Sequence, residues 1–408
     1  MKHLLSLALG LGMLSGVIAQ APNELSLQTL FERHRWFELR DAVAGKAVPA
    51  LYSGAVASAF NQTADAERYL RRAVREAANV EAANDARDVL ANLYMRLGRS
   101  ADMVRIIDDA LAAAPSRSDL RSALRSFESF RRVPDQTVRA ARGRPFHCSV
   151  RDDGVRLPLV VNGRSVEWLF DTAFSHSAVS ESEARLLGIS VHAGIGTAED
   201  FAGGSTPFRT AVATRVALGD AELRNVPVLV FSDSQPPWSD EAPGKRGTIA
   251  LPVVLALEGI RWTKDGTCQV GSNVASAGRA EANLAFDGAT PLTRVQMSGR
   301  PLDFVLDTGN QAGTQLWERF ARDFPEVAST GHKTTLQLHQ IGGSTGREIL
   351  AVSEIMLRVG GFDKILRPAN IFSRPVGNDR QHGILGMDIL SQASDVVLDF
   401  RAMSLAAR

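Results

Sequence analysis

The sequence predicts a mainly β protein made of two related halves, preceded by an α-helical segment. Three observations predict this fold class. Residues 147–408 alternate short β-rich runs with glycine-bearing turns, two stretches in that region match each other without a gap, and residues 51–115 are rich in alanine with helical periodicity. Because 408 residues exceed the size of one ordinary core, we expect two or three domains.

The first residues have the pattern of a secretory signal. Lys2 precedes an apolar run from Leu4 to Ile18, and small residues lie before Gln20. We therefore expect residues 1–19 to be a signal peptide and the mature protein to be exported, either periplasmic or secreted. A single membrane anchor is the alternative. The run is shorter than the roughly 20 residues that span a bilayer, so we expect no stable membrane span after signal removal.

Residues 20–132 are predicted to be helical. The stretch ANLYMRLGRSADMVRIIDDALAAAP has small, aromatic, turn and terminating residues at spacings that resemble a tetratricopeptide repeat, and SGAVASAFNQTADAERYLRRAV matches more weakly. Two repeats bury too little surface to be stable alone, so we expect them to pack on the rest of the chain. They are a candidate surface for a protein partner, and a plain helical hairpin without a groove is the alternative. The positions are Ala91, Tyr94, Gly98, Ile107, Ala110 and Pro115, and earlier Gly54, Ala57, Ala66, Leu70 and Ala73.

The pattern changes after the helical segment. Residues 133–146 are polar and bounded by Pro134 and Pro145, which predicts a linker. The stretch RLPLVVNGRSVEWLF then predicts two strands joined at Asn162 and Gly163, because an Asn-Gly pair between alternating apolar residues is a strong hairpin signal.

This hairpin leads into an aspartate that has a counterpart far along the chain. A lone Asp171 before a helix is also typical of a helix cap. The later stretch MSGRPLDFVLDTGNQ, however, lies over VNGRSVEWLFDTAFS without a gap. Asp307 and Thr308 thus stand 136 residues after Asp171 and Thr172 (307 − 171 = 136). Two copies of the motif in matched hairpins are a much stronger signal than one.

The similarity continues past each aspartate. DFAGGSTPFR corresponds to HQIGGSTGRE, and GTIALPVVL corresponds to GILGMDIL. This sets Ala250 and Gly386 each 79 residues after their aspartate (250 − 171 and 386 − 307). GIRWTKDGTCQV and DVVLDFRAMSL then each predict a strand, a tight turn and a strand. Residues 147–272 and 273–408 are therefore predicted to be two copies of one β unit.

A strand ending in Asp-Thr-Gly, a helix, a glycine-tipped hairpin and a late apolar-apolar-Gly element resemble the aspartic peptidases. The pattern is similar in particular to the bacterial retropepsin-like proteases, here duplicated in one chain as in pepsin-like enzymes. The resemblance implies a pseudo-twofold aspartic-protease fold with Asp171 and Asp307 as the catalytic pair. It also implies that Thr172 and Thr308 cross-link the two loops by hydrogen bonds. The other implied site residues are Ala173 and Gly309 beside the pair and, in two flaps over the peptide, Gly203, Gly204, Ser205, Gly342, Gly343 and Ser344.

Peptide hydrolysis by such a pair needs one carboxylate to activate water and one protonated carboxyl to polarise the scissile carbonyl. At about 3 Å and an effective dielectric near 20, two carboxylates repel by roughly 5 to 6 kcal/mol, which keeps one of them protonated. We therefore predict an exported aspartic endopeptidase that acts on a peptide or protein substrate without a cofactor. The alternative is a non-catalytic peptide-binding or scaffold protein with a degenerate cleft and the helices as its working surface.

Several positions depart from the family pattern. Ala173 stands where the first loop would have glycine, which adds a methyl group at a crowded point. Phe174 stands beside the carboxylate where a small residue is usual, and Asn310 and Gln311 replace small or hydroxyl residues in the second loop. These residues either shape a restricted cleft or mark a decayed site.

Other motifs favour less specific interpretations. GGSTG at 342–346 has the spacing of a nucleophile elbow, but that elbow needs a strand before it and a helix after it, and the matched copy favours a hairpin. The eight histidines show no metal-ligand spacing, which predicts no metal site, and His176 is expected at the surface or behind the site. SESEARLLGI predicts a helix capped by Ser180 and Glu183 and ended by Gly188.

The charge balance bears on which partners the chain can bind, and the two cysteines bear on the redox compartment. With 46 basic and 45 acidic residues the chain gives no electrostatic reason to bind nucleic acid, and no such partner is expected. Cys148 and Cys268 lie on the predicted strands that open and close the first half. In an oxidising compartment they can pair, and two buried free thiols are the alternative that the sequence leaves open.

Overall fold

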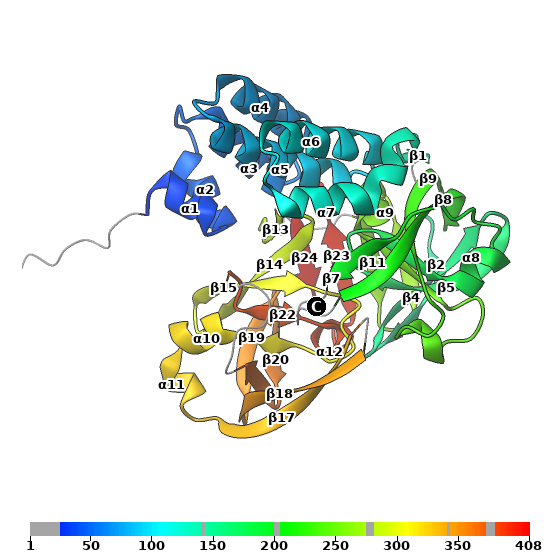
Figure 1. The fold of residues 1–408 in the computed structure, drawn as a ribbon. Coiled ribbons are helices and arrows are strands. Elements are labelled where there is room, and N and C mark those ends of the chain that lie inside the picture. Colours follow the sequence, from blue (N-terminus) through cyan, green and yellow to red (C-terminus); the bar gives the residue numbers. More distant parts are fainter. Residues whose placement is uncertain (1–24, 140–142, 200–204, 275–280, 341–342, 373–379) are drawn as a thin grey trace, which may run out of the picture.

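The computed structural model describes residues 25–139, 143–199, 205–274, 281–340, 343–372 and 380–408. Helices from the N-terminal part of the chain lie across two large β-sheets and one small one (Figure 1). The predicted signal peptide, residues 1–19, lies outside the described residues. No helix among the described residues is long and apolar enough to span a bilayer.

The helical segment contains two longer helix pairs, and small residues permit their close packing. A Cβ on Gly54 would come within 2.7 Å of the Cγ of Leu70, so only glycine fits where these two helices meet. Tyr94 and Ile107 are buried in the core that the next two helices share. These positions are among those that the sequence pattern selected. The helices are α1 (Leu27–Glu32), α2 (Trp36–Val43), α3 (Ala50–Ala59), α4 (Thr63–Glu76), α5 (Val80–Arg96), α6 (Ser100–Ala113), α7 (Ser118–Phe127) and the 3-10 helix η1 (Glu128–Arg132).

Residues 133–146, predicted to be a linker, contribute two edge strands instead. β1 (Thr137–Arg139) pairs antiparallel with β9 (Ala221–Phe231), and β2 (Phe146–His147) pairs with β12 (Thr267–Val270). The backbone N–H groups of this stretch can complete open sheet edges because its two prolines lie outside both strands. The segment is thus anchored to the β region at both ends.

The first large sheet carries Asp171. Its hairpin of β4 and β5 turns at Asn162 and Gly163, whose φ values of 49° and 86° suit this pair, so the predicted hairpin is confirmed. β10 runs parallel to β5, with Ala250 opposite Asp171. The strand order is β1-β9-β6-β10-β5-β4-β8-β7. The strands not yet given are β3 (Ser149–Arg151), β4 (Gly154–Val161), β5 (Arg164–Asp171), β6 (Ser177–Ser180), β7 (Gly196–Glu199), β8 (Ser205–Leu218) and β10 (Gly247–Ala250).

The second large sheet has the same pairings around Asp307. β14 and β15 form an antiparallel hairpin, and β22 runs parallel to β15 with Leu385 opposite Leu306. The strand order is β17-β18-β21-β16-β22-β15-β14-β19-β20, with β13 paired to β14. The strands are β13 (Leu284–Asp287), β14 (Thr290–Met297), β15 (Arg300–Leu306), β16 (Gln315–Leu316), β17 (His332–Gln340), β18 (Gly343–Val352), β19 (Ile355–Val359), β20 (Phe362–Leu366), β21 (Ala369–Phe372) and β22 (Gly383–Leu385).

Short helices follow the strands at several points of the β region. They are α8 (Glu181–Leu186), η2 (Trp238–Asp240), α9 (Leu251–Ala256), η3 (Ser272–Val274), α10 (Glu318–Asp323), α11 (Pro325–Ala328) and α12 (Met387–Leu390). The start of α8 is capped as predicted, since the Ser180 hydroxyl accepts the Glu183 N–H at 3.3 Å. The predicted return bond from Glu183 is absent. Its carboxylate instead accepts the indole N–H of Trp168 at 3.2 Å, and the Ser180 N–H donates to the Arg246 carbonyl at 3.0 Å.

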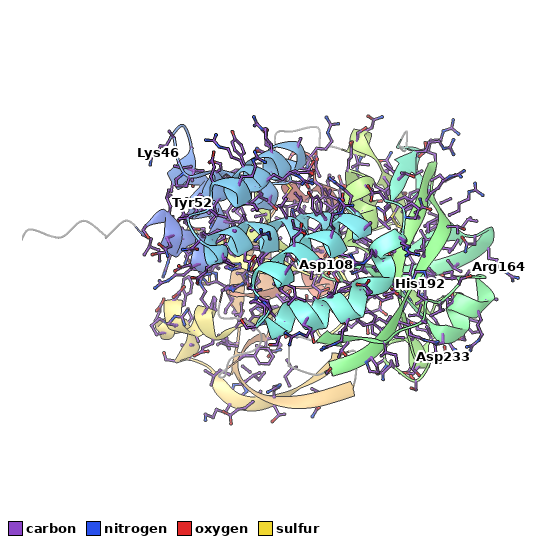
Figure 2. All side chains as sticks on the ribbon, turned by 45° about the horizontal axis from the view of Figure 1, so that its top comes forward. Lys46, Tyr52, Asp108, Arg164, His192 and Asp233 are labelled. Atoms are coloured by element: carbon purple, nitrogen blue, oxygen red, sulfur yellow. A yellow bond between two sulfur atoms is a disulfide. The ribbon has the colours of Figure 1, made fainter. Side chains whose placement is uncertain are left out.

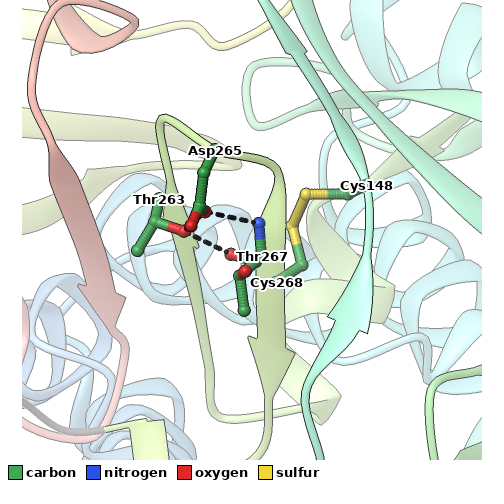
Figure 3. The surroundings of a disulfide bond; sticks show 5 residues. All are labelled: Cys148, Thr263, Asp265, Thr267 and Cys268. Atoms are coloured by element: carbon green, nitrogen blue, oxygen red, sulfur yellow. Dashed lines mark hydrogen bonds between the residues drawn. A yellow bond between two sulfur atoms is a disulfide. The ribbon is translucent and has the colours of Figure 1, made fainter.

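The small sheet combines strands from both predicted halves. β11 (Gly259–Thr263) pairs with β12 on one side and with β23 (Asp395–Asp399) on the other, and β24 (Ser404–Ala407) follows β23. At one edge a disulfide joins Cys148 to Cys268, with 5.8 Å between their Cα atoms (Figure 3). The cysteine pairing that the sequence left open is thus a disulfide in this structure.

The helical segment and the second large sheet share a hydrophobic core. Trp36 and Phe37 of α2 belong to the same buried cluster as Leu292 of β14 and Val305 of β15. The guanidinium of Arg294 lies 4.0 Å from the centre of the Phe37 ring. Ala55 and Ala59 of α3 belong to the same cluster, so the expectation that the helices pack on the rest of the chain is confirmed.

Arg96 of α5 makes a polar contact at this junction. Its side chain is 1% exposed, and its guanidinium donates to the carbonyl oxygens of Ser58, at 2.8 Å, and Gly288. It also lies 4.4 Å from the centre of the Phe286 ring. Burial lowers the pKa of Arg96 to about 9, so the group stays charged at neutral pH. The turn between β13 and β14 therefore occupies part of the helix surface that carries Arg96.

Candidate active site

Asp171 and Asp307 stand at the ends of two equivalent strands. Asp171 is the last residue of β5, and Asp307 follows β15 directly. The Asp307 N–H donates to the Leu385 carbonyl of the parallel neighbour β22 at 3.0 Å, and Ala250 of β10 is the register partner of Asp171. Both aspartate side chains are half-buried. Each carboxyl group thus emerges where a parallel strand pair ends.

The two threonines that follow the aspartates bind each other across the two aspartate loops. The Thr172 N–H donates to the Thr308 hydroxyl oxygen at 3.1 Å, and the Thr308 N–H donates to the Thr172 hydroxyl oxygen at 3.2 Å. Each hydroxyl in turn donates to a carbonyl of the opposite strand, that of Leu306 at 2.6 Å and that of Phe170 at 2.8 Å. Both side chains are fully buried. These four hydrogen bonds bring the predicted cross-linking residues together.

The loop backbone orients both carboxylates. The N–H groups of Ala173 and Phe174 donate to one oxygen of Asp171 at 2.8 and 3.0 Å, and the Gly309 N–H donates to Asp307 at 2.9 Å. A Cβ on Gly309 would overlap the carboxyl group of Asp171. The second loop therefore touches the first aspartate, and glycine is required at this contact.

Both carboxyl groups have raised pKa values. Burial raises the pKa of Asp171 to about 6, although the N–H groups of Ala173 and Phe174 oppose this rise. Burial, followed by the negative charge of Asp171, raises the pKa of Asp307 well above its ordinary value. Because one carboxylate disfavours ionisation of the other, the pair retains a proton at pH values where an isolated aspartate is ionised. The arrangement can supply one acid and one base.

Two of the four residues that depart from the aspartic-peptidase pattern, Ala173 and Phe174, lie on the first loop and are accommodated there. The methyl group of Ala173 packs against the buried cluster that contains Trp317 and Ile384. The ring of Phe174 is directed to Phe231, with 6.2 Å between ring centres. Ala173 therefore fits without displacing the carboxylate. Glycine is sterically required in the second loop, at Gly309, and not at the position of Ala173.

Two further hydroxyl residues tie the late elements to the aspartate loops. The Ser177 hydroxyl accepts the Ala250 N–H at 3.2 Å, and the Thr314 hydroxyl accepts the Gly386 N–H at 3.0 Å. Thr314 also donates to Asp388 at 2.8 Å. Sequence reasoning missed these residues because they stand six and seven residues after their aspartates (177 − 171 and 314 − 307), so the gapless overlay does not align them. A hydroxyl residue shortly after each aspartate was the available signal.

The predicted flap residues fall on two antiparallel hairpins. Glu199 of β7 pairs with Ser205 of β8, and Gln340 of β17 pairs with Gly343 of β18. Because β18 is a strand, GGSTG is not followed by the helix that a nucleophile elbow requires. Gly203, Gly204 and Gly342 lie outside the described residues. Gly343 and Ser344 are placed in β18 by their backbone, and Ser205, which opens β8, is exposed.

His176 lies behind the first loop and is 2% exposed. Burial lowers the pKa of His176 to about 4, so its ring is neutral at the pH where a shared-proton pair exists. Within the described part of the chain, no group of three or more His, Cys, Asp or Glu side chains is placed to hold a metal ion.

Comparison with known proteins gives one family match. The model of the aspartyl protease family matches residues 157–245, a stretch that contains Asp171 and ends before Asp307. A retropepsin-like aspartic protease from Rickettsia conorii, known from a crystal structure, is similar at 15% identity, over 34% of this chain and 95% of that chain, with a TM-score of 0.24. No curated protein sequence matches the chain. The family similarity thus lies around the first aspartate.

Proposed function

We propose that the chain is an aspartic endopeptidase in which Asp171 and Asp307 form one catalytic pair. The observation that carries this proposal is the reciprocal hydrogen bonding of Thr172 and Thr308. These bonds hold together the loops of two aspartates that are 136 residues apart in the sequence. The family match around Asp171 supports the same activity. The equivalent pairings of β5 with β10 and β15 with β22 support a duplicated unit with one site in each chain.

The chemistry follows from the shared proton. The ionised carboxylate takes a proton from a water molecule as its oxygen attacks the scissile carbonyl carbon, while the protonated carboxyl donates its proton toward the carbonyl oxygen. A tetrahedral diol forms, and its collapse breaks the C–N bond as the amine nitrogen receives a proton. Because the proton belongs to the pair, neither aspartate has a fixed role as acid or base.

Export is part of the proposal. The disulfide between Cys148 and Cys268 supports an oxidising compartment, where such bonds form and persist. The expected signal pattern at residues 1–19 agrees with this compartment. Mass spectrometry of protein recovered from the periplasm or medium should give a mature chain that begins near Gln20.

A non-catalytic peptide-binding or scaffold protein is the rival function. It would use the helices as a working surface for a partner protein, yet Arg96 binds Gly288 of the chain itself on that surface. A cavity of about 490 Å³ remains beside this contact. Its lining includes Phe31, His34, Trp36, Asp85, Asp88, Asn92, Arg96, Phe286, Asp287 and Arg380. The structure gives the rival no observation as specific as the threonine pair.

Peptide cleavage by the full-length protein tests the proposal. Asp171→Asn and Asp307→Asn keep the side-chain shape and remove the shared proton, so each should lower the cleavage rate by about 10²- to 10⁴-fold. A statine-type inhibitor should block the parent. Asp265→Asn is a matched control, because Asp265 supports the β11–β12 turn by accepting the Thr267 N–H at 3.1 Å and the Thr263 hydroxyl (Figure 3). If both Asn variants cleave as fast as the parent, the peptidase proposal is wrong and the binding function should replace it.

A further inference from the structure

The end of the helical segment packs directly on the loop that carries Asp171. The Phe127 ring of α7 stacks on the imidazole of His176, with 5.2 Å between ring centres and 20° between planes. Phe130 of η1 stacks on the same imidazole at 5.9 Å. His176 follows Asp171 by five residues (176 − 171 = 5). The buried end of the aspartate loop is thus covered by two aromatic rings from the helices.

The same helix end holds the first hairpin. The Thr197 N–H of β7 donates to the Ser126 hydroxyl at 3.4 Å, and the Phe127 ring lies 5.8 Å from the Phe208 ring of β8. A Cβ on Gly196 would come within 2.9 Å of the Ser126 Cβ, so the backbone of β7 touches the helix. Figure 1 shows α7 lying beside β7. The hairpin predicted to be a flap therefore rests on α7.

Polar contacts strengthen this junction just beyond the helix. The hydroxyl groups of Ser129 and Thr210 are hydrogen-bonded, and Thr210 also bonds the Nδ1 atom of His192 at 3.2 Å. The Phe130 ring meets the His192 ring edge-on, with 6.2 Å between centres. Figure 2 labels His192 where the green strands of the first half meet the cyan helices. Aromatic contacts and side-chain hydrogen bonds thus both fix the helical segment to β8.

A continuous series of rings connects Phe127 to the aspartate. Phe208 lies 5.9 Å from Phe231, and Phe231 lies 6.2 Å from Phe174. The Phe174 N–H donates to the Asp171 carboxylate. Phe127 therefore contacts both structures that define the first side of the site, the aspartate loop through His176 and the hairpin through Phe208.

We propose that Phe127 is a positioning residue for the Asp171 loop and for the β7–β8 hairpin at once, so that the docked helical segment sets the geometry of the active site. This inference rests on the proposed peptidase function. A misplacement of about 1 Å in a catalytic group can cost about a hundredfold in rate. Removal of the ring should therefore lower kcat, although both aspartates are still present in the variant.

The test compares three variants of the full-length protein, each assayed well below its Tm. Phe127→Ala should lower kcat for peptide cleavage by about tenfold and raise amide deuterium uptake in residues 172–178 and 196–199. Phe127→Tyr keeps the ring at this half-buried position, so it should restore both readouts. Tyr69→Ala is the matched control, since it also removes a half-buried ring, one that lies 4.6 Å from the guanidinium of Arg68 on the same helix. It should leave kcat and uptake at both segments unchanged.

The outcomes separate the inference from the proposed function. A merely structural role would lower the Tm of Phe127→Ala and leave kcat and local uptake unchanged, which would overturn the inference. A rise in uptake at only one of the two segments would also overturn it, because Phe127 would then position only one element. If the parent cleaves no peptide, the proposed function fails and the uptake comparison alone decides the inference.

Discussion

Thr172 and Thr308 are hydrogen-bonded to each other in both directions, N–H to hydroxyl oxygen, at 3.1 and 3.2 Å. Each hydroxyl is used twice, because it also donates to a carbonyl of the strand that leads into the other aspartate. Neither aspartate loop can therefore satisfy its buried polar groups without the other. We therefore expect one chain to complete the site without a second copy.

Thr172→Val should destabilise the protein through this linkage. Valine has nearly the same shape, but it leaves the Thr308 N–H and the Leu306 carbonyl without partners in a buried place. We expect the free energy of unfolding to fall by about 2–4 kcal/mol in denaturant titration, with a loss of cleavage activity.

Thr293→Val is the control for this variant. Thr293 is also fully buried, and its hydroxyl has no hydrogen-bond partner among the described residues. Its replacement should leave the free energy of unfolding unchanged or higher, since an unpaired hydroxyl is removed from the core. Equal effects of the two substitutions would show that the cross-link contributes nothing specific.

Glycine should be needed in the second aspartate loop and dispensable in the first. Gly309→Ala would drive a methyl group into the Asp171 carboxyl, so we expect a loss of about 1–3 kcal/mol in the free energy of unfolding and a strong loss of cleavage. Ala173→Gly removes a methyl group that packs on an apolar cluster, so it should preserve the cleavage rate. Thermal unfolding and peptide cleavage of both variants, measured side by side, check the asymmetry. A Gly309→Ala protein as active as the parent would contradict it.

Cleavage should require an intermediate pH. Below the lower pKa of the pair both carboxyls are protonated and no base remains, and above the upper pKa both are ionised and no acid remains. Because burial raises the pKa of both Asp171 and Asp307, the upper limit should lie well above the ordinary aspartate range. A kcat/KM profile measured from acid to neutral pH checks this. A rate that stays constant through neutral and alkaline pH would contradict a shared proton.

The same raised pKa values predict the direction of the pH effect on stability. A carboxyl whose pKa is higher in the folded state than in the unfolded state stabilises the fold at low pH, and this contribution is lost as the pH rises through the folded value. For Asp171 the pKa is about 4 in the unfolded chain and about 6 in the folded protein, so the stabilisation is lost as the pH rises from about 4 to about 6. Asp171→Asn should therefore gain Tm relative to the parent as the pH rises across this window. A Tm difference that does not change with pH would contradict the raised pKa.

The disulfide should contribute measurably to stability. It closes a loop of 120 residues, and removal of such a bond typically costs about 2–5 kcal/mol. A Cys148→Ala, Cys268→Ala double variant should unfold at lower denaturant concentration than the parent and should be insensitive to a reductant. A parent midpoint that reductant leaves unchanged, with the bond shown to be reduced, would argue against a stabilising role.

The sequence was most informative where a residue type has few structural uses. An Asn-Gly pair between apolar runs predicted the β4–β5 turn at Asn162, and a serine before an acidic helix start predicted the cap at Ser180. The first two signals are local, so no knowledge of the rest of the fold was needed for them. The meeting of Thr172 and Thr308 was implied by the resemblance to the aspartic peptidases that the matched Asp-Thr motifs carry.

Contacts between distant and dissimilar residues were not predictable in this way. Nothing in the residues near Phe127 indicates that its ring would stack on His176, and a helical arginine such as Arg96 usually faces solvent. Glu183 fitted a capping box, but a buried tryptophan N–H competed for its carboxylate. The strands in residues 133–146 were missed because their partners, β9 and β12, lie about a hundred residues further along the chain.

β11, the central strand of the small sheet, pairs with neighbours that are synthesised at very different times. β11 can pair with β12 almost at once, but its other neighbour, β23, is synthesised about 130 residues later. Until then one side of β11 is an open edge whose backbone groups can pair with another chain, a known source of aggregation. β23 and β24 therefore complete a sheet that β11 and β12 begin. Truncation within residues 395–407 should send the protein to the insoluble fraction even though both aspartate loops remain intact.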